Sequence, residues 1–353
     1  MKKSLIALAV LAASGAAMAQ SSVTLFGIVD TAVGYVDHAN AAGDSVYGLT
    51  TSGNATSRLG FRGVEDLGGG LKAGFWLEGE ITGDNGNAAG FNFQRRSTVS
   101  LMGGFGEVRM GRELTPGYSK TALYDLFGQV GVGHFMGWTG NWYGTGGDSG
   151  NGVRSNNMIS YYTPNFSGFT AGLGYGFDEQ TTGKGGRYIG GYVAYDNGPL
   201  SVAASYDERS VGAVTSPAPI AAFDRNSLTL AGSYNLKVAK LIAILQRTED
   251  DRPGLSDRKV NAYALGVSAP VGAGEVKLQY ALYDQKATDS KAHHISLGYV
   301  HNLSKRTAVY GTVAFMDNKD ASNMGLTAKN LNTGGPGAGE SQTGVQVGIR
   351  HAF

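Results

Sequence analysis

The sequence has no cysteine, 8 prolines in 353 residues and only 16% charged residues. The lack of cysteine excludes a disulfide framework, thiolate metal sites, cysteine nucleophiles and iron–sulfur clusters. Basic and acidic residues nearly cancel, at 29 and 28, so the chain lacks the bulk basic field that binds nucleic acid. After residue 20, no apolar run approaches the ~18 residues of a transmembrane helix.

Glycine, by contrast, is abundant. The 56 glycines are roughly twice the ordinary share for a protein of this length. They follow no period of three, which excludes a collagen helix. The 42% hydrophobic and 10% aromatic residues exclude a disordered chain or a linker. The chain is therefore a folded protein that uses glycine for a structural purpose.

The first nineteen residues have the pattern of a secretory signal peptide. Lys2 and Lys3 precede the short apolar run Leu5–Ala13, and small residues stand at the cleavage positions. We expect cleavage between Ala19 and Gln20, so that residues 1–19 are the signal peptide and residues 20–353 form one mature domain. An apolar N-terminal core helix fits less well, because a polar residue and a strand pattern follow at once.

Beyond the signal peptide, hydrophobic residues recur with a period of two rather than 3.6, which indicates β-strands. A clear example is Phe169, Ala171, Leu173, Tyr175 and Phe177, which alternate with Thr170, Gly172, Gly174 and Gly176. The apolar face of such strands is rich in Tyr, Phe and Leu, whereas the other face carries Arg, Lys, Glu, Thr and Ser.

The connections between these strands alternate in length. The seven short turns are Glu65–Gly70, Gly103–Gly106, Thr163–Gly168, Asp196–Pro199, Asn235–Leu236, Pro270–Gly274 and Asn302–Ser304. The eight long polar loops are Asp37–Ala55, Ile81–Phe93, Glu113–Gly152, Asp178–Gly186, Glu208–Asp224, Thr248–Asp257, Gln285–Lys291 and Asp317–Glu340. Fifteen connections predict sixteen strands.

This pattern predicts an all-β fold, a transmembrane sixteen-stranded antiparallel β-barrel with lipid outside and water inside. A soluble β-sandwich also shows alternation, but it does not separate long from short connections by parity. A β-propeller needs a repeat for each blade, and the sequence has no internal period.

Five blocks spread over the mature chain resemble the Gram-negative general-diffusion porins of the β-proteobacterial type. They are Ser21–Val36, Ser57–Glu78 (the most specific block), Gly106–Tyr118, Asn156–Phe177 and the closing Gly344–Phe353 with its terminal phenylalanine.

The resemblance implies an outer-membrane homotrimer that is exported through the periplasm. It also implies that the third long loop, Glu113–Gly152, folds into the pore as a constriction. The loop departs from the family in lacking a proline within Leu123–Gly128. Expected partners are outer-membrane lipid and lipopolysaccharide, the barrel-assembly machinery, for which Phe353 would be the C-terminal assembly signal, and small hydrophilic solutes and ions.

A pore needs a narrow point and an electric field across it. Alternation predicts a basic wall on the lumen face, with one member at a strand–loop junction; its residues are Arg58, Arg62, Arg96, Arg109, Arg112 and Arg154. We expect Glu113 and Asp125 on the third loop to oppose this wall, and the net field to favour anions. Two alternatives remain open: Arg58 forms a wall salt bridge with Glu78 or Glu80, or the paired charges cancel and selectivity is weak.

The glycines at 172, 174 and 176 would leave the inner face of one strand bare. Such a wall gives a folded-in loop room to approach closely. General barrel curvature and tight turns are the simpler use of glycine.

No histidine cluster has metal-ligand spacing, so we expect no metal and no cofactor. His294 and Ser296 share a strand face, as in outer-membrane phospholipases, but no orienting residue is evident. Trp138, Trp142 and Tyr143 either stack sugars or pack a loop.

The sequence thus predicts a non-enzymatic outer-membrane porin for passive diffusion of ions and small hydrophilic solutes, weakly anion-preferring. The alternatives are a substrate-specific channel and a barrel whose long loops serve surface display or adhesion.

Overall fold

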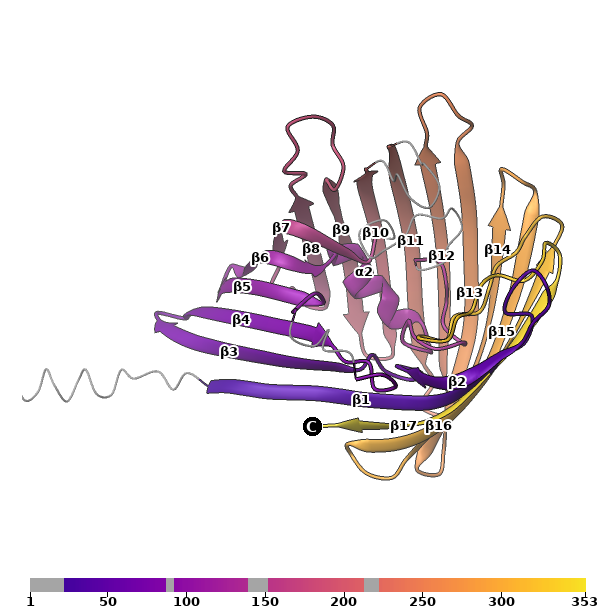
Figure 1. The fold of residues 1–353 in the computed structure, drawn as a ribbon. Coiled ribbons are helices and arrows are strands. Elements are labelled where there is room, and N and C mark those ends of the chain that lie inside the picture. The colour runs from indigo at the N-terminus through magenta and orange to yellow at the C-terminus, as the bar shows by residue number, and fades with distance from the viewer. Residues whose placement is uncertain (1–21, 87–91, 139–151, 213–221) are drawn as a thin grey trace, which may run out of the picture.

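The computed structural model describes residues 22–86, 92–138, 152–212 and 222–353, which form a single β-barrel (Figure 1). The expected cleavage site at Ala19 and Gln20 lies outside the described residues. The strands and short helices are β1 (Ser22–Val36), β2 (Val46–Thr51), β3 (Arg58–Gly68), β4 (Leu71–Glu80), β5 (Arg96–Gly103), β6 (Gly106–Leu114), α2 (Pro116–Thr121), η2 (Ala122–Tyr124), β7 (Arg154–Tyr162), β8 (Phe169–Gly176), β9 (Tyr188–Asn197), β10 (Leu200–Val211), β11 (Phe223–Asn235), β12 (Lys240–Asp251), β13 (Arg258–Val271), β14 (Gly274–Gln285), β15 (Ser290–Asn302), β16 (Thr307–Lys319) and β17 (Ser341–Ala352).

The sheet closes because β1 pairs with β17 on one side and with β2 and β3 on the other. β2 pairs with residues 31–36 of β1, and β3 pairs with residues 22–28. β2 and β3 therefore together occupy one strand position in the barrel. All neighbouring pairs are antiparallel, and the predicted sixteen-stranded antiparallel barrel is confirmed. The short turns lie at one end, the turn end, together with the start of β1 and the end of β17. The long loops lie at the loop end.

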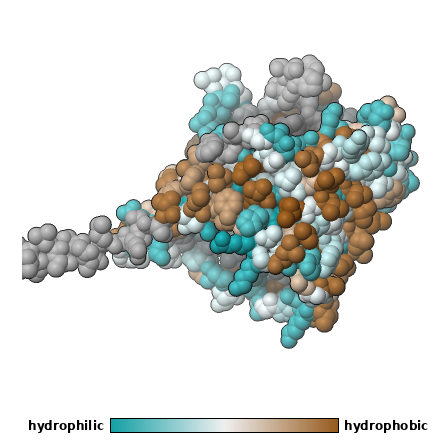
Figure 2. Space-filling model, turned by 60° about the horizontal axis from the view of Figure 1, so that its bottom comes forward, coloured by the Kyte–Doolittle hydropathy of each residue, from teal (hydrophilic) through white to brown (hydrophobic). Residues whose placement is uncertain are grey.

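Alternation decides which side chains face outward. On β10, Val202 and Tyr206 are 40% and 52% exposed, whereas Ala203 and Ser205 between them are 6% and 3% exposed. Figure 2 shows hydrophobic side chains in patches over the strands, with hydrophilic ones on the protruding loops and turns. An apolar outer face and a polar or small inner face are what a barrel in lipid requires. None of the helices in the described ranges is long and apolar enough to cross a membrane.

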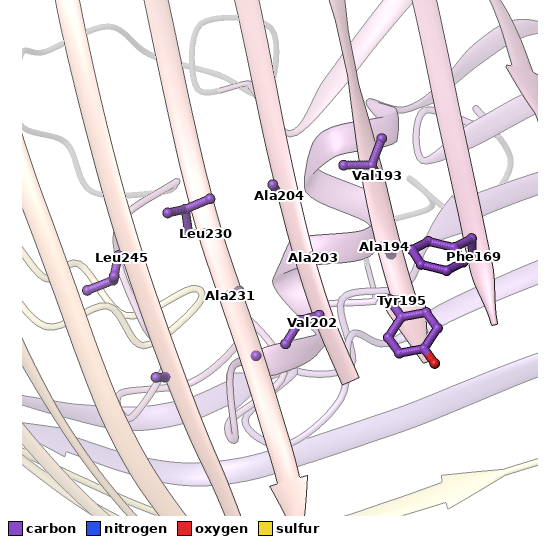
Figure 3. Close-up of a pocket in the computed structure, with 12 residues that line it drawn as sticks. Phe169, Val193, Ala194, Tyr195, Val202, Ala203, Ala204, Leu230, Ala231 and Leu245 are labelled. Carbon is purple, nitrogen blue, oxygen red and sulfur yellow. The ribbon is translucent and has the colours of Figure 1, made fainter. Parts of the chain in front are cut away.

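Over β8 to β12, the outward-facing side chains differ strongly in size. Small outward positions such as Ala204, Gly232 and Ala243 lie among Val193, Leu230 and other large side chains, leaving an apolar hollow of about 470 Å³ (Figure 3). The helix α2 contacts the inner side of the same strands, β8 to β11. This part of the wall is therefore thin, because small residues occur on both of its faces.

The C-terminal residue closes the barrel seam. The backbone N–H groups of Gly27 and Phe353 each donate to the carbonyl of the other, both at 3.1 Å. The ring of Phe353 lies where a side chain at position 27 would project. Glycine at 27 is thus required for the terminal ring to pack against β1.

We predict that Gly27→Ala destabilises the seam by about 1–3 kcal/mol, the usual cost of overpacking. The added methyl would displace the Phe353 ring and would also approach the carbonyl oxygen of Arg58, at 2.9 Å. Thermal unfolding followed by electrophoretic mobility measures the change. Gly311→Ala is the matched control, because its nearest neighbour would be 3.9 Å away. Equal melting temperatures for the two variants would contradict this account of Gly27.

Candidate functional site

The third loop, residues 115–153 between β6 and β7, crosses the lumen instead of extending outward (Figure 1). In its described part, residues 115–138 and 152–153, the backbone reaches the far wall. The Val132 N–H donates to the Gln346 side chain of β17 at 2.9 Å, and the Met136 N–H donates to the Tyr283 hydroxyl of β14 at 2.9 Å. The predicted infolding of this loop is confirmed, although the segment Leu123–Gly128 lacks the family's proline.

The start of the loop packs against the glycine-lined wall. A Cβ at Gly174 of β8 would lie 3.1 Å from the ring of Pro116 in α2, so the bare strand does make room for the loop. Lys120 of α2 forms an ion pair of 2.8 Å with Asp196 at the turn end of β9. The Tyr124 hydroxyl bonds Ser201 Oγ at 2.8 Å, and burial raises the pKa of Tyr124, which keeps this phenol neutral.

Asp125 is 5% exposed and organises the tip of the third loop. Its carboxylate accepts hydrogen bonds from the backbone N–H groups of Phe127, Gln129 and Phe135 at 3.3, 2.7 and 3.1 Å. It also accepts from the side-chain amides of Gln129 and Gln279 at 3.0 and 2.9 Å. The structure therefore gives Asp125 a role in shaping the loop, beyond the expected role of a charge facing the basic wall.

A second segment enters the lumen between β2 and β3. Residues 52–57 leave the sheet, and the Asp30 carboxylate of β1 accepts the N–H groups of Gly53, Asn54 and Ala55 at 3.3, 2.8 and 2.6 Å. The Tyr310 hydroxyl donates to the same carboxylate at 2.5 Å. Asp30 is fully buried. This carboxylate fixes the segment that leads directly into Arg58.

Removing only the hydroxyl tests this arrangement. Tyr310→Phe is expected to lower the free energy of unfolding by about 2 kcal/mol, because a hydrogen bond to a buried carboxylate is lost. Tyr299→Phe removes a hydroxyl that makes only exposed contacts, one of them at 3.4 Å, and should change stability by less than about 0.5 kcal/mol. Denaturant unfolding in detergent measures both. Comparable losses of unfolding free energy in the two variants would contradict the role of Asp30 and Tyr310 in fixing residues 52–57.

A cavity of about 630 Å³ lies between the third loop and the part of the wall that includes β3, β4 and the residues before β5. Tyr118 and Leu123 of the loop and Leu114 at the end of β6 line one side of it. Its charged lining comprises the basic residues Arg58, Arg95, Arg154 and Lys329 and the acidic residues Glu80 and Asp125. This is the candidate constriction, and its cations outnumber its carboxylates.

The charges of this cavity are not all paired. Glu78 binds Arg95 with an ion pair of 2.7 Å, and Glu80 binds Lys329. Arg58 stands opposite Glu80 in the strand register, but it makes no ion pair or side-chain hydrogen bond with any other residue that the structure describes. Arg58 therefore forms no wall salt bridge with either glutamate, since Arg95 and Lys329 bind them, although Glu78 attracts Arg58 at longer range.

Three other predicted arginines, Arg62, Arg96 and Arg109, form a separate cluster nearer the turn end. Glu113 is 4% exposed and binds Arg96 at 2.6 Å and Arg109 at 2.9 Å. Arg109 also binds Glu107 at 3.0 Å. Together with Arg62 these arginines line a second cavity of about 370 Å³. Glu113 thus neutralises part of its own wall instead of facing it across the pore.

Arg112 does not join either cavity, and its expected lumen position is corrected by the structure. Arg112 pairs with Ser97, which is two residues from the outward Val99. Its Nε donates to the Gln94 carbonyl and its Nη1 to Asn156 Oδ1. Strand alternation itself places Arg112 on the outward face with Met110, because the inward residues of β6 are Arg109 and Glu113.

Two cations of the constriction were missed by strand alternation. Arg95 immediately precedes β5, where the period of two does not yet apply. Lys329 belongs to the loop between β16 and β17, which turns inward. In that loop Leu326 is fully buried, and Asn318 donates to the Met324 carbonyl at 3.0 Å. An inward loop with a buried centre fits surface display poorly.

Two other groups of residues that the sequence singled out either contact the third loop or belong to it. His294 and Ser296 do lie 3.0 Å apart, but both are 1% exposed, and His294 also contacts the Val132 carbonyl at 3.1 Å. Trp138 packs edge-to-face against Tyr118 and Phe135. Trp142 and Tyr143 lie outside the described residues. Within the described ranges, no group of three or more His, Asp or Glu residues is placed to hold a metal ion.

With this geometry in place, comparison with known proteins identifies the family. A family model described as Gram-negative porin matches residues 5–321. The chain is 67% identical to outer membrane porin protein 32 of Delftia acidovorans over the full length of both proteins. The chain belongs to the Gram-negative porin family. It is also 34% identical to an outer membrane porin protein of Bordetella pertussis over the full length of both.

Among solved structures, the anion-selective porin from Comamonas acidovorans matches with a TM-score of 0.89 and 63% identity, over 95% of this chain and all of that one. The porin described above is therefore an outer-membrane channel protein. Its barrel is the wall of the channel, and the third loop narrows it.

Proposed function

We propose that this porin is a general-diffusion channel that prefers anions, and that the preference arises in the cavity beside the third loop. The observation that carries the proposal is that four cations and two carboxylates line this cavity. One of the carboxylates, Glu80, is already bound by Lys329, and Arg58 forms no ion pair with any described residue, although Glu78, which Arg95 binds, attracts it at longer range. A fixed excess of positive charge at the narrowest point concentrates anions and repels cations. The similar protein from Comamonas acidovorans is an anion-selective porin, which agrees with this assignment.

The test is the reversal potential of the purified channel in a planar bilayer under a salt gradient. In a chloride salt, the reversal potential of an anion-preferring channel has the same sign as the equilibrium potential of chloride. A cation-preferring sign, or a potential near zero at low salt, would contradict the proposal. Current that rises linearly with solute concentration supports general diffusion, whereas saturation and competitive inhibition would indicate the substrate-specific alternative.

The assembly of the channel is part of the same proposal. We propose cleavage after Ala19, insertion by the barrel-assembly machinery through the terminal Phe353, and a homotrimer surrounded by outer-membrane lipid and lipopolysaccharide. N-terminal sequencing of the mature protein should begin at Gln20, and native mass spectrometry should give three copies of the chain. Passage through the pore requires no catalysed reaction and no cofactor, so we propose that the protein is not an enzyme.

A further inference from the structure

The apolar hollow on the outer wall continues beyond the part drawn in Figure 3. A second outward hollow, of about 900 Å³, lies over β6 to β11. Val193 and Ala204 line both this hollow and the one of about 470 Å³, so the two are continuous. We call them together the outer groove. The volume of each part falls within the ~300–1,000 Å³ of small-molecule sites.

Outward residues of contrasting size form the floor and the sides of the outer groove. The floor consists of small residues that include Gly191, Ala204 and Ala243. Leu173 lies opposite Gly191 in the strand register, and Val193 lies opposite Ala204. These two large side chains are 64% and 62% exposed. Because this wall faces the membrane, hydrocarbon must fill the space between them, and a flexible acyl chain fits such a narrow space.

The two ends of the outer groove differ in charge. Glu208 lies at the loop end and is the only charged residue among the described residues that line the groove. Lys237 lies at the turn end, in the turn of the β11–β12 hairpin that carries Gly232 and Ala243. It is exposed and makes no ion pair with any residue that the structure describes. An anionic head group is therefore attracted to the turn end and repelled from the loop end.

The residues around Lys237 place it at the surface of the membrane. Its neighbours Leu236 and Val238 are 48% and 76% exposed, so apolar side chains flank the ammonium group. On the adjacent hairpin, the Tyr195 hydroxyl accepts a hydrogen bond of 2.8 Å from the Asn197 side chain. Amphipathic tyrosines mark the boundary between hydrocarbon and head groups. Short turns of such barrels face the periplasm, so this boundary belongs to the inner leaflet.

We propose that the outer groove binds one glycerophospholipid of the inner leaflet. One acyl chain would lie over Ala204 and Ala243, and the phosphate would bind the Lys237 ammonium group. Phosphate oxygens are strong acceptors for an ammonium group, and burial of the chain supplies most of the attraction. The site rests on the lipid surroundings proposed above, but not on the ion selectivity, because none of these residues lines the constriction.

Native mass spectrometry of the purified porin measures the bound lipid. We expect one phosphatidylglycerol per chain to remain bound at detergent concentrations that remove the other lipids. Diacylglycerol with the same acyl chains lacks the phosphate and should bind at least about threefold more weakly. Equal binding of these two lipids would overturn the proposal. Bound lipopolysaccharide that phosphatidylglycerol does not displace would overturn it as well.

Substitutions that fill the groove test where the acyl chain lies. Ala204→Leu and Ala243→Leu should each raise the half-saturating phosphatidylglycerol concentration about fivefold or more, because the added side chain takes the place of the acyl chain. Ala269→Leu is the matched control, since Ala269 lies on β13 outside the groove lining, and it should change this value less than about twofold. Equal shifts in the three variants would overturn the site. Loss of the oligomer in Ala204→Leu with unchanged lipid binding would also overturn it, because the groove would then be a contact between copies of the chain.

Lys237→Gln tests the head-group contact without altering the barrel wall. It should weaken binding of phosphatidylglycerol about threefold and leave binding of diacylglycerol unchanged. Lys305→Gln is the matched control, since Lys305 is an exposed lysine in the turn between β15 and β16. Comparable losses in the two lysine variants would indicate a general charge effect and would overturn the site.

The Lys237 substitution also keeps the proposal testable if a groove variant does not assemble, because it lies in a turn. None of the substitutions in the groove or at Lys237 should change the reversal potential. Failure of the selectivity proposal is therefore distinguishable from failure of this one.

Discussion

Arg58→Glu is expected to abolish the anion preference of the channel. The substitution changes the charge of the constriction by two units at a position that forms no ion pair with any described residue, and it leaves as many carboxylates as cations in the lining. A unit charge at about 4–8 Å is worth about 0.5–1 kcal/mol in water. The anion-to-cation permeability ratio should therefore fall by up to about tenfold.

Reversal potentials at 0.1 M and 1 M salt measure this effect. The change should shrink at 1 M, where the screening length falls to about 3 Å. Arg247→Glu is the matched control, since Arg247 lies on the outer face of β12 with its side chain 55% exposed. A permeability ratio that Arg58→Glu leaves within twofold of the parent, or that Arg247→Glu changes as much, would contradict the assignment of selectivity to this cavity.

Asp125→Ala is expected to release the tip of the third loop. The substitution leaves five N–H groups without their acceptor, and the loss of such a buried carboxylate costs on the order of 3–5 kcal/mol. The loop should detach from Gln279 on β14, so that single-channel conductance and current noise increase. Its tip should also become more accessible to protease.

Trypsin cleavage after Lys120 provides a second measurement, because this lysine lies in α2 and is held by Asp196. Cleavage should be faster by about tenfold or more in Asp125→Ala and unchanged in Asp257→Ala, which makes the same replacement in an exposed loop. If Asp125→Ala altered only ion selectivity, with conductance and cleavage as in the parent, Asp125 would be a charge of the ion path instead of an anchor of the loop.

The architecture could be predicted from the sequence because it depends on local regularities. A period of two places Val202 and Tyr206 outside and Ser205 inside, whatever the neighbouring strands are. The parity of long and short connections predicted the strand number correctly, and the bare glycine face at Gly174 predicted where the loop would pack.

The roles of individual charged residues were harder to predict from the sequence. Arg62, Arg96 and Arg109 face the lumen as alternation predicts, but they occupy a different cavity from Arg58. Arg112 lies on the outward face with Met110, out of phase with the inward Arg109 and Glu113. Glu113 and Asp125 were predicted to oppose the basic wall. Glu113 binds two arginines of that wall. Asp125 instead accepts hydrogen bonds within its own loop and from Gln279 of β14.

The sequence by itself therefore determined a closed, sixteen-stranded barrel with an apolar outside, a polar inside and a long third loop. These features follow from chain-local periodicity, which each strand satisfies on its own. Only the tertiary structure decided that Arg58, Arg95, Arg154 and Lys329 meet at one constriction. They come from strand ends and an inward loop, where the orientation of a side chain is set by contacts with residues far away in the sequence.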